Sequence, residues 1–152
     1  MVEIKKITIK GGSGWCPPDE AYEDTVIITE KGISYSLKYS EEKPWQPSRS
    51  IKWSYMADSM SFRELFMQLQ NAVLPIMDLE EFSWCDAGMN KFTFLFSDGT
   101  KQEKTFFGSS ELFDRCFRVA KKMIPPCEEV PNVLKTEEDY EEDDEDDEEF
   151  DD

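Results

Sequence analysis

The chain has 152 residues, with 34 Asp and Glu against 17 Lys and Arg and no histidine, so its formal net charge is −17 at pH 7. This excess of acids argues against direct binding to nucleic acid, because phosphates have to be neutralised by Lys and Arg. No apolar run approaches the roughly 18 residues of a membrane-spanning helix, so we expect no membrane span.

The negative charge is concentrated at one end of the chain. Residues 137–152 hold 14 of the 34 acids and no base, so residues 1–136 hold 20 acids against all 17 bases, a net charge of −3. A segment of repelling charges with few apolar residues does not form a core. We therefore predict a single domain in residues 1–136 and a disordered acidic tail in residues 137–152.

The start of the chain and the cysteines indicate the compartment. The first residues lack the apolar stretch of a secretory signal, so we expect a cytoplasmic protein. The cysteines Cys16, Cys85, Cys116 and Cys127 form no C-x₂-C pair, and the usual zinc ligand sets also need histidine. We predict partly buried free thiols, no metal site and no cofactor.

Alternation of apolar and polar residues predicts strands in the first part of the chain. Residues 2–10 form the first strand, and the Gly-Gly-Ser-Gly run at residues 11–14 then predicts a flexible loop. Residues 25–29 and 33–39 lie on either side of a short glycine-containing connection, and the odd positions of the second run fall on one face. This arrangement predicts a hairpin.

A fourth strand and a helix follow. Residues 51–55 alternate, and this pattern places Trp53 in the core. A stripe at helical spacing then predicts a helix that begins after Ser59 or at a capping box starting at Ser61, and Pro75 is expected to end it. The stripe consists of Phe62, Leu65, Phe66, Leu69 and Val73. We expect residues 76–90 to be a loop with one short strand.

The second half repeats a hairpin and a helix. Phe92, Phe94 and Phe96 alternate before the turn residues 97–100, Ser-Asp-Gly-Thr, and residues 104–107 return as the second strand of the hairpin. Ser109 or Ser110 caps a final helix that ends before the Pro-Pro pair at residues 125–126. Its apolar face comprises Leu112, Cys116, Val119, Ala120 and Met123.

This order of elements predicts the fold class. Hairpins need only short turns, whereas parallel strands need crossovers. We therefore predict an α+β fold, mainly an antiparallel sheet of about six strands with two helices on one face. The other face of the sheet is then exposed to water or covered by a partner.

The sequence offers few routes to catalysis. The absence of histidine excludes Ser–His and Cys–His nucleophiles, and neither a G-x-S-x-G elbow nor a P-loop is present. We therefore predict that the protein is not an enzyme. The alternative is a carboxylate-dependent hydrolase or lyase, which needs two acids to converge in space. Candidates by residue type are Asp19, Glu20, Asp24, Glu80, Glu81, Asp86 and Asp98, of which Asp98 is better explained by its turn.

Three tryptophans lie in glycine- and proline-rich or irregular segments: Trp15, Trp45 and Trp84. Large aromatics in loops either pin the loop to the domain or anchor a protein interface. Trp45 is the strongest candidate for partner binding, because prolines on both sides limit how far it folds back.

The tail carries a high linear charge. Fourteen carboxylates over 16 extended residues amount to one charge about every 4 Å, close to the roughly 3.4 Å spacing along a DNA strand. Such a tail attracts basic surfaces, and the alternative is that it only keeps the protein soluble. The candidate partner-binding residues of the tail are Glu137, Glu138, Asp139, Tyr140, Glu141, Glu142, Asp143, Asp144, Glu145, Asp146, Asp147, Glu148, Glu149, Phe150, Asp151 and Asp152.

These patterns favour a non-enzymatic acidic interaction protein. We expect the domain and its polyanionic tail to bind or inhibit a basic protein partner, such as a nucleic-acid-binding protein whose basic groove the tail would occupy. The two alternatives are a small carboxylate-dependent hydrolase or lyase, and a soluble domain whose tail only confers solubility.

Overall fold

The computed structural model describes residues 2–14, 16–17, 20–41, 45, 49–84, 87–126 and 128–136. Its elements, in chain order, are β1 (Ile4–Gly12), β2 (Tyr22–Thr29), β3 (Gly32–Tyr39), β4 (Ile51–Met56), α1 (Met60–Asp78), β5 (Met89–Phe96), β6 (Lys101–Phe107), α2 (Glu111–Lys121) and the short 3-10 helix η1 (Asn132–Leu134).

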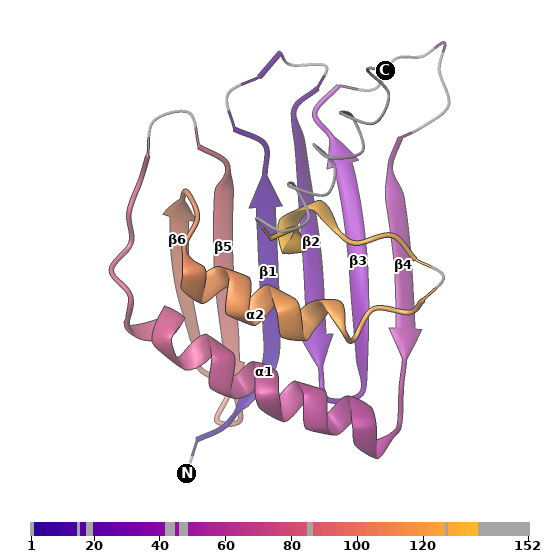
Figure 1. The fold of residues 1–152 in the computed structure, drawn as a ribbon, viewed down its shortest axis with the longest axis vertical. Helices are drawn as coiled ribbons and strands as arrows, with labels where there is room; N and C mark the ends of the chain where they lie inside the picture. The colour runs from indigo at the N-terminus through magenta and orange to yellow at the C-terminus, as the bar shows by residue number, and fades with distance from the viewer. Residues whose placement is uncertain are drawn as a thin grey trace, which may run out of the picture.

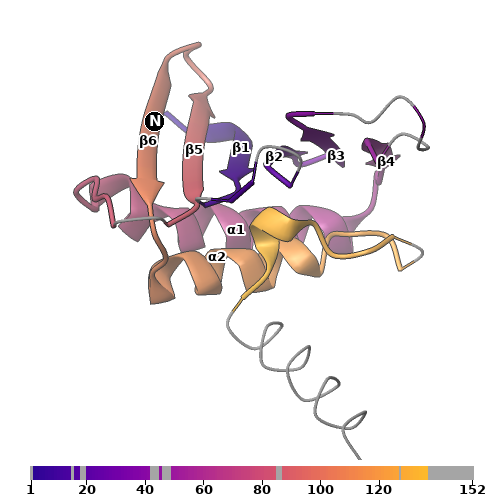
Figure 2. The same ribbon diagram turned by 90° about the horizontal axis from the view of Figure 1, so that it is seen from above.

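The strands form one sheet in the order β4-β3-β2-β1-β5-β6, and every pair of neighbours is antiparallel. Both long helices cover the same face of this sheet (Figures 1 and 2). The predicted α+β class, with six antiparallel strands and two helices on one face, is thus confirmed for the described residues. Within these residues, neither helix has the length and apolar character needed to cross a bilayer.

The core lies between the sheet and the helices. Along β1, Ile7 and Ile9 are fully buried, and Ile9 stands opposite Val26 on β2 and Phe92 on β5. The buried residues of α1 are Phe62, Phe66, Leu69, Val73 and Ile76, and those of α2 are Phe113, Cys116, Phe117 and Ala120. The core therefore forms where alternate strand residues pack against helix residues that recur about every 3.6 positions.

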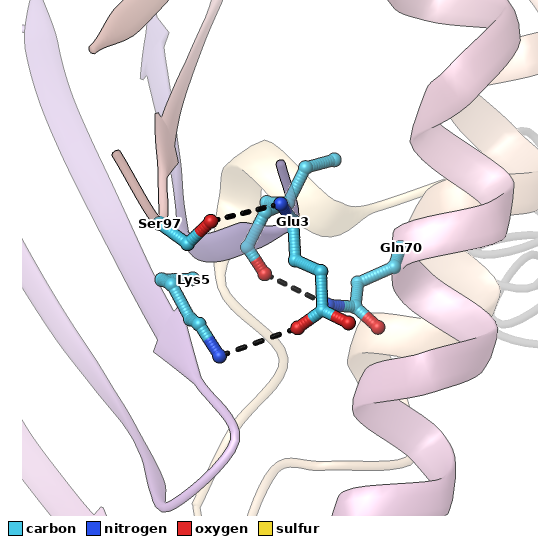
Figure 3. Close-up of polar contacts among 5 residues, drawn as sticks. Glu3, Lys5, Gln70 and Ser97 are labelled. Carbon is cyan, nitrogen blue, oxygen red and sulfur yellow. Dashed lines mark hydrogen bonds and ion pairs between the residues drawn. The ribbon is translucent and has the colours of Figure 1, made fainter. Parts of the chain in front are cut away.

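The start of β1 is tied both to the β5–β6 turn and to α1 (Figure 3). The backbone N–H of Glu3 donates to Ser97 Oγ at 3.0 Å, and Gln70 Nε2 donates to the Ile4 carbonyl at 2.7 Å. These bonds satisfy backbone groups at the point where the strand begins.

The predicted loop at residues 11–14 is partly wrong, because β1 continues through Gly12. Gly11 and Gly12 pair with β2 on one side and with β5 on the other, so two ladders hold them. A Cβ atom at Gly11 would lie 2.6 Å from Val133 Cγ2. Glycine therefore marks a close approach between β1 and η1 rather than a loop.

The predicted ends of α1 also need correction. Ser59, not Ser61, is the N-cap, and its side chain accepts the backbone N–H of Phe62 at 3.2 Å. The helix does not end at Pro75 but continues to Asp78. Proline removes one backbone hydrogen bond and its ring crowds the carbonyl four residues earlier, and full burial of Ile76 in the next position offsets this cost. Residues 76–78 are therefore helical rather than loop.

The other predicted elements are found close to where the sequence places them. Both hairpins are present, and Ser110 rather than Ser109 caps α2. In the β5–β6 turn, Asp98 Oδ1 accepts the backbone N–H of Thr100 at 3.0 Å, which confirms its role in the turn. Trp53 is only half-buried, since β4 is an edge strand, although its ring lies 5.8 Å from that of Tyr35.

Candidate functional site

A cavity of about 340 Å³ opens at one end of the sheet, between the end of β1, the start of β5, the first turn of α2 and η1. Part of its wall is glycine: Gly11, Gly12, Gly88 and Gly108. These residues leave space that side chains would fill, and Gly108 at φ +145° also adopts a backbone conformation that other residues rarely take. The charged residues that line the cavity are Asp24, Asp114 and Lys135, and Trp84 also belongs to its lining.

Asp24 is the buried acid of this cavity, with 1% of its surface exposed. Its Oδ2 accepts the hydroxyl of Tyr35 at 2.9 Å and the backbone N–H of Val133 at 2.9 Å. Its Oδ1 has no hydrogen-bond partner within the part of the chain that the structure describes. The carboxyl thus joins β2 to β3 and to η1 while keeping one oxygen unsatisfied.

Burial is the main influence on the ionisation of Asp24 and Tyr35. Loss of water around Asp24 raises the pKa of its carboxyl above 3.8, although the hydrogen bonds from Tyr35 and Val133 act in the opposite direction. The pKa of Tyr35 is also raised, first by burial and then by the neighbouring charge of Asp24. The site therefore favours a hydroxyl that donates its proton in a hydrogen bond over one that loses it.

Trp84 lies at the rim of the cavity with 54% of its surface exposed. Its ring stacks on Phe82 at 5.1 Å, and its backbone N–H donates to the Phe107 carbonyl at 2.7 Å. The backbone is fixed to the end of β6 while much of the indole faces solvent. Trp84 is therefore partly pinned and partly available for contact, which combines the two alternatives that the sequence left open.

Lys135 borders the same cavity and is followed by Thr136 and the acidic residues 137–152. Lys121 Nζ donates to Thr136 Oγ1 at 3.2 Å, which holds the end of the described chain against α2. The structure thus brings Trp84, which the sequence singled out, to the same cavity as Lys135, two positions before the acidic segment. The sequence alone does not reveal this proximity, because the two are about 50 residues apart.

Trp45 lies elsewhere, in the connection between β3 and β4, with 77% of its surface exposed. Arg49 helps to hold this connection, since its guanidinium lies 3.8 Å from the centre of the Tyr39 ring and donates to the Glu41 carbonyl at 3.0 Å. The side chain of Trp45 is thus mostly exposed, and its role in partner binding stays a prediction. The β4 edge is five strand spacings from β6, about 24 Å, so Trp45 and Trp84 do not share one pocket.

Several candidates lie outside the described residues. These are Trp15, the whole acidic segment 137–152 and the acids Asp19 and Asp86. Of the other candidate acids, Glu20 and Glu80 are exposed, and Glu81 Oε2 accepts the backbone N–H of Thr105 at 2.9 Å. Asp24 instead shares its cavity with Asp114, which the sequence reasoning missed because spacing along the chain does not show convergence in space.

A second concave surface lies on the sheet face opposite the helices. It is a groove of about 420 Å³, to which β1, β2, β3 and β4 contribute. Its polar lining consists of three lysines, three hydroxyl residues and one acid, namely Lys10, Lys38, Lys52, Thr25, Ser36, Ser50 and Glu23. We call it the lysine groove. The sequence reasoning missed it, although the alternation of its lysines with core residues was a usable signal.

The described residues contain no group of three or more Cys, Asp or Glu side chains suited to holding a metal ion. Comparisons of this chain with protein-family models, with curated proteins and with solved structures found no match.

Proposed function

We propose that this protein is a non-enzymatic binding module for a basic protein partner. The acidic segment 137–152 attracts the partner, and the end of the sheet that carries the cavity contacts it. The observation that supports this function most directly is that Trp84 and Lys135, the latter two positions before the acidic segment, border the same cavity. A partner drawn in by the acidic segment would meet Trp84 there.

The cavity suits a cationic side chain. Two carboxyl groups, those of Asp24 and Asp114, contribute to its wall, and Lys135 is the opposing charge among the described lining residues. The face of an indole attracts Lys and Arg, by about 0.5–1 kcal/mol at exposed sites. An Arg or Lys of the partner inserted beside Trp84 would therefore gain charge attraction and ring contact together.

The acidic segment and the cavity have different effects on binding. Attraction between opposite charges speeds association and weakens as salt screens charges beyond about 8–10 Å. Buried aromatic contacts mainly slow dissociation. A segment with the charge spacing of a nucleic-acid strand also competes for basic grooves, so the proposed module would inhibit a partner that uses such a groove.

The test is capture of basic proteins from a lysate between about 50 and about 500 mM NaCl. Full-length protein is compared with a version lacking residues 137–152 and with Trp84→Ala. Deletion should reduce capture most strongly at low salt, whereas Trp84→Ala should weaken it by about tenfold across the salt range. Met67→Ala is the matched control, because Met67 is 62% exposed but lies on α1.

Two results would contradict this proposal. Equal capture by the full-length and the deleted protein would leave only a role in solubility for residues 137–152. Equal losses from Trp84→Ala and Met67→Ala would exclude the cavity rim as the contact surface.

A further inference from the structure

The face of the sheet opposite the helices is basic, although the protein as a whole is acidic. The strand register places six lysines on this face, namely Lys6, Lys10, Lys38, Lys52, Lys91 and Lys101. Against them stand Glu23 and Glu103, which form ion pairs with Lys10 at 3.5 Å and with Lys91 at 3.7 Å. The face thus has a net charge of +4 within residues 1–136, whose total is −3.

The lysine groove lies on this face and has the groups that an acidic peptide needs. Lys10 stands opposite Thr25, Thr25 opposite Ser36, and Ser36 opposite Lys52. Cation and hydroxyl donors therefore form one row across four strands. Three strand spacings separate Lys10 from Lys52, about 14 Å, and carboxylates spaced about 4 Å apart along an extended peptide would match this row.

The start of the acidic segment lies within reach of the groove. Val133 packs against Gly11 on the helix side of β1, and Lys10, the residue before Gly11, faces the groove on the other side. Thr136 follows three residues after Val133. The 16 residues that come next can span up to about 53–58 Å, enough to pass around the end of the sheet.

We propose that residues 137–152 dock in the lysine groove of their own chain, so that a basic partner has to displace them. Attachment to the same chain supplies the acidic segment at an effective concentration in the millimolar range, well above that of a dilute second copy. This regulatory role rests on the proposed function, because docking would occupy the same acidic segment that attracts the partner.

Docking would lower the affinity for a basic partner by a calculable factor. The apparent dissociation constant equals the intrinsic one divided by the fraction of molecules with an undocked segment. If two thirds of the molecules are docked, removal of docking tightens binding about threefold. Salt would release the segment, because the contacts are between exposed charges.

Zero-length carbodiimide cross-linking of the full-length chain tests where residues 137–152 dock. At low salt and low protein concentration, cross-links within one monomer should join residues 137–152 to Lys10, Lys38 or Lys52 more often than to Lys31, at the other end of the sheet. Cross-links spread equally over these lysines would overturn the proposal. So would groove cross-links confined to dimers, which would show docking between two copies.

A charge-matched pair of variants tests whether the lysine groove and a basic partner compete for residues 137–152. Lys10→Gln/Lys38→Gln/Lys52→Gln and the control Lys5→Gln/Lys31→Gln/Lys122→Gln each remove three charges from the full-length chain, and Lys122 is an exposed residue at the end of α2, away from the basic face. The groove variant should bind poly-L-lysine about threefold more tightly than the control, and equal affinities would overturn the proposal. Circular dichroism verifies that both variants are folded.

The failure of the docking can be told apart from the failure of the proposed function. Cross-links to the groove lysines, without capture of basic proteins that depends on residues 137–152, would refute only the proposed function. Such capture without cross-links to the groove lysines would refute only the docking.

Discussion

At the scale of single residues, Asp24 makes the most consequential contacts. Its carboxyl lies among core residues and ties three separate elements together through Tyr35 and Val133. A buried carboxylate is costly unless donors surround it, and here one oxygen has two donors and the other has no partner among the described residues. Sequence patterns did not distinguish Asp24 from the other candidate acids.

This environment predicts a pH dependence of stability. The pKa of Asp24 in the folded protein is raised above 3.8, mainly by burial, so the folded protein binds this proton more tightly than the unfolded chain. The contribution of Asp24 to the free energy of unfolding is therefore largest below about pH 4. It declines as the pH rises through the raised pKa.

Asp24→Asn removes this titration and keeps a similar shape. We expect the free energy of unfolding of Asp24→Asn, minus that of the natural protein, to increase as the pH rises from 4 and to level off above the folded pKa. Urea unfolding of both proteins at a series of pH values measures the difference. A difference that stays constant or falls with pH would contradict the prediction.

At the scale of elements, the start of α1 shows how tertiary context selects among local signals. Ser59 and Ser61 both precede the apolar stripe, and Ser61 is followed by Glu64 in the pattern of a capping box. The helix nevertheless begins two residues earlier, with Ser59 as its N-cap. Ala57 is buried and its backbone N–H bonds to the Lys31 carbonyl, so β3 and β4 set where the chain enters the helix.

The cap predicts a contrast between two serines. Ser59→Ala should lower the free energy of unfolding by about 1 kcal/mol, because the N–H of Phe62 loses its acceptor. Ser61→Ala, at an exposed position inside the helix, should change it by less than about 0.5 kcal/mol. Urea denaturation of the two variants measures both effects. A larger loss of unfolding free energy for Ser61→Ala would indicate that Ser61, as the start of the capping box, is the N-cap instead.

Sequence periodicity did not predict the segment 131–136, which contains the short helix η1 (Asn132–Leu134). Three residues in η1 are too few to show a period, and their position depends on Asp24, Gly11 and Lys121, which are distant in sequence. The consequence for the site is large, since Asn132 and Val133 of η1 form one side of the cavity.

At the scale of the whole molecule, the described residues share one contiguous core that joins the sheet to both helices. A single core predicts one cooperative unfolding transition. Tryptophan fluorescence and far-ultraviolet circular dichroism should therefore give the same urea midpoint. Two separated midpoints would show that part of the structure unfolds independently.

The arrangement of charge is also a property of the whole molecule. The strands direct lysines to one face while the acids of residues 1–136 lie mostly elsewhere, and the sequence adds 14 carboxylates in residues 137–152. A protein with a net charge of −17 thereby has a basic surface. Net charge alone predicts how the protein behaves in bulk, but the distribution decides which surfaces attract one another.

The sequence by itself determined the α+β class, both hairpins, the two helices and the concentration of negative charge, because these depend on periodicity and composition within short windows. Only the tertiary structure decided that Gly11 receives η1, that Asp24 and Asp114 share a cavity with Trp84, and that Lys10, Lys38 and Lys52 line one groove. Strand register and helix packing bring together residues far apart in the chain, and no local pattern encodes such distances.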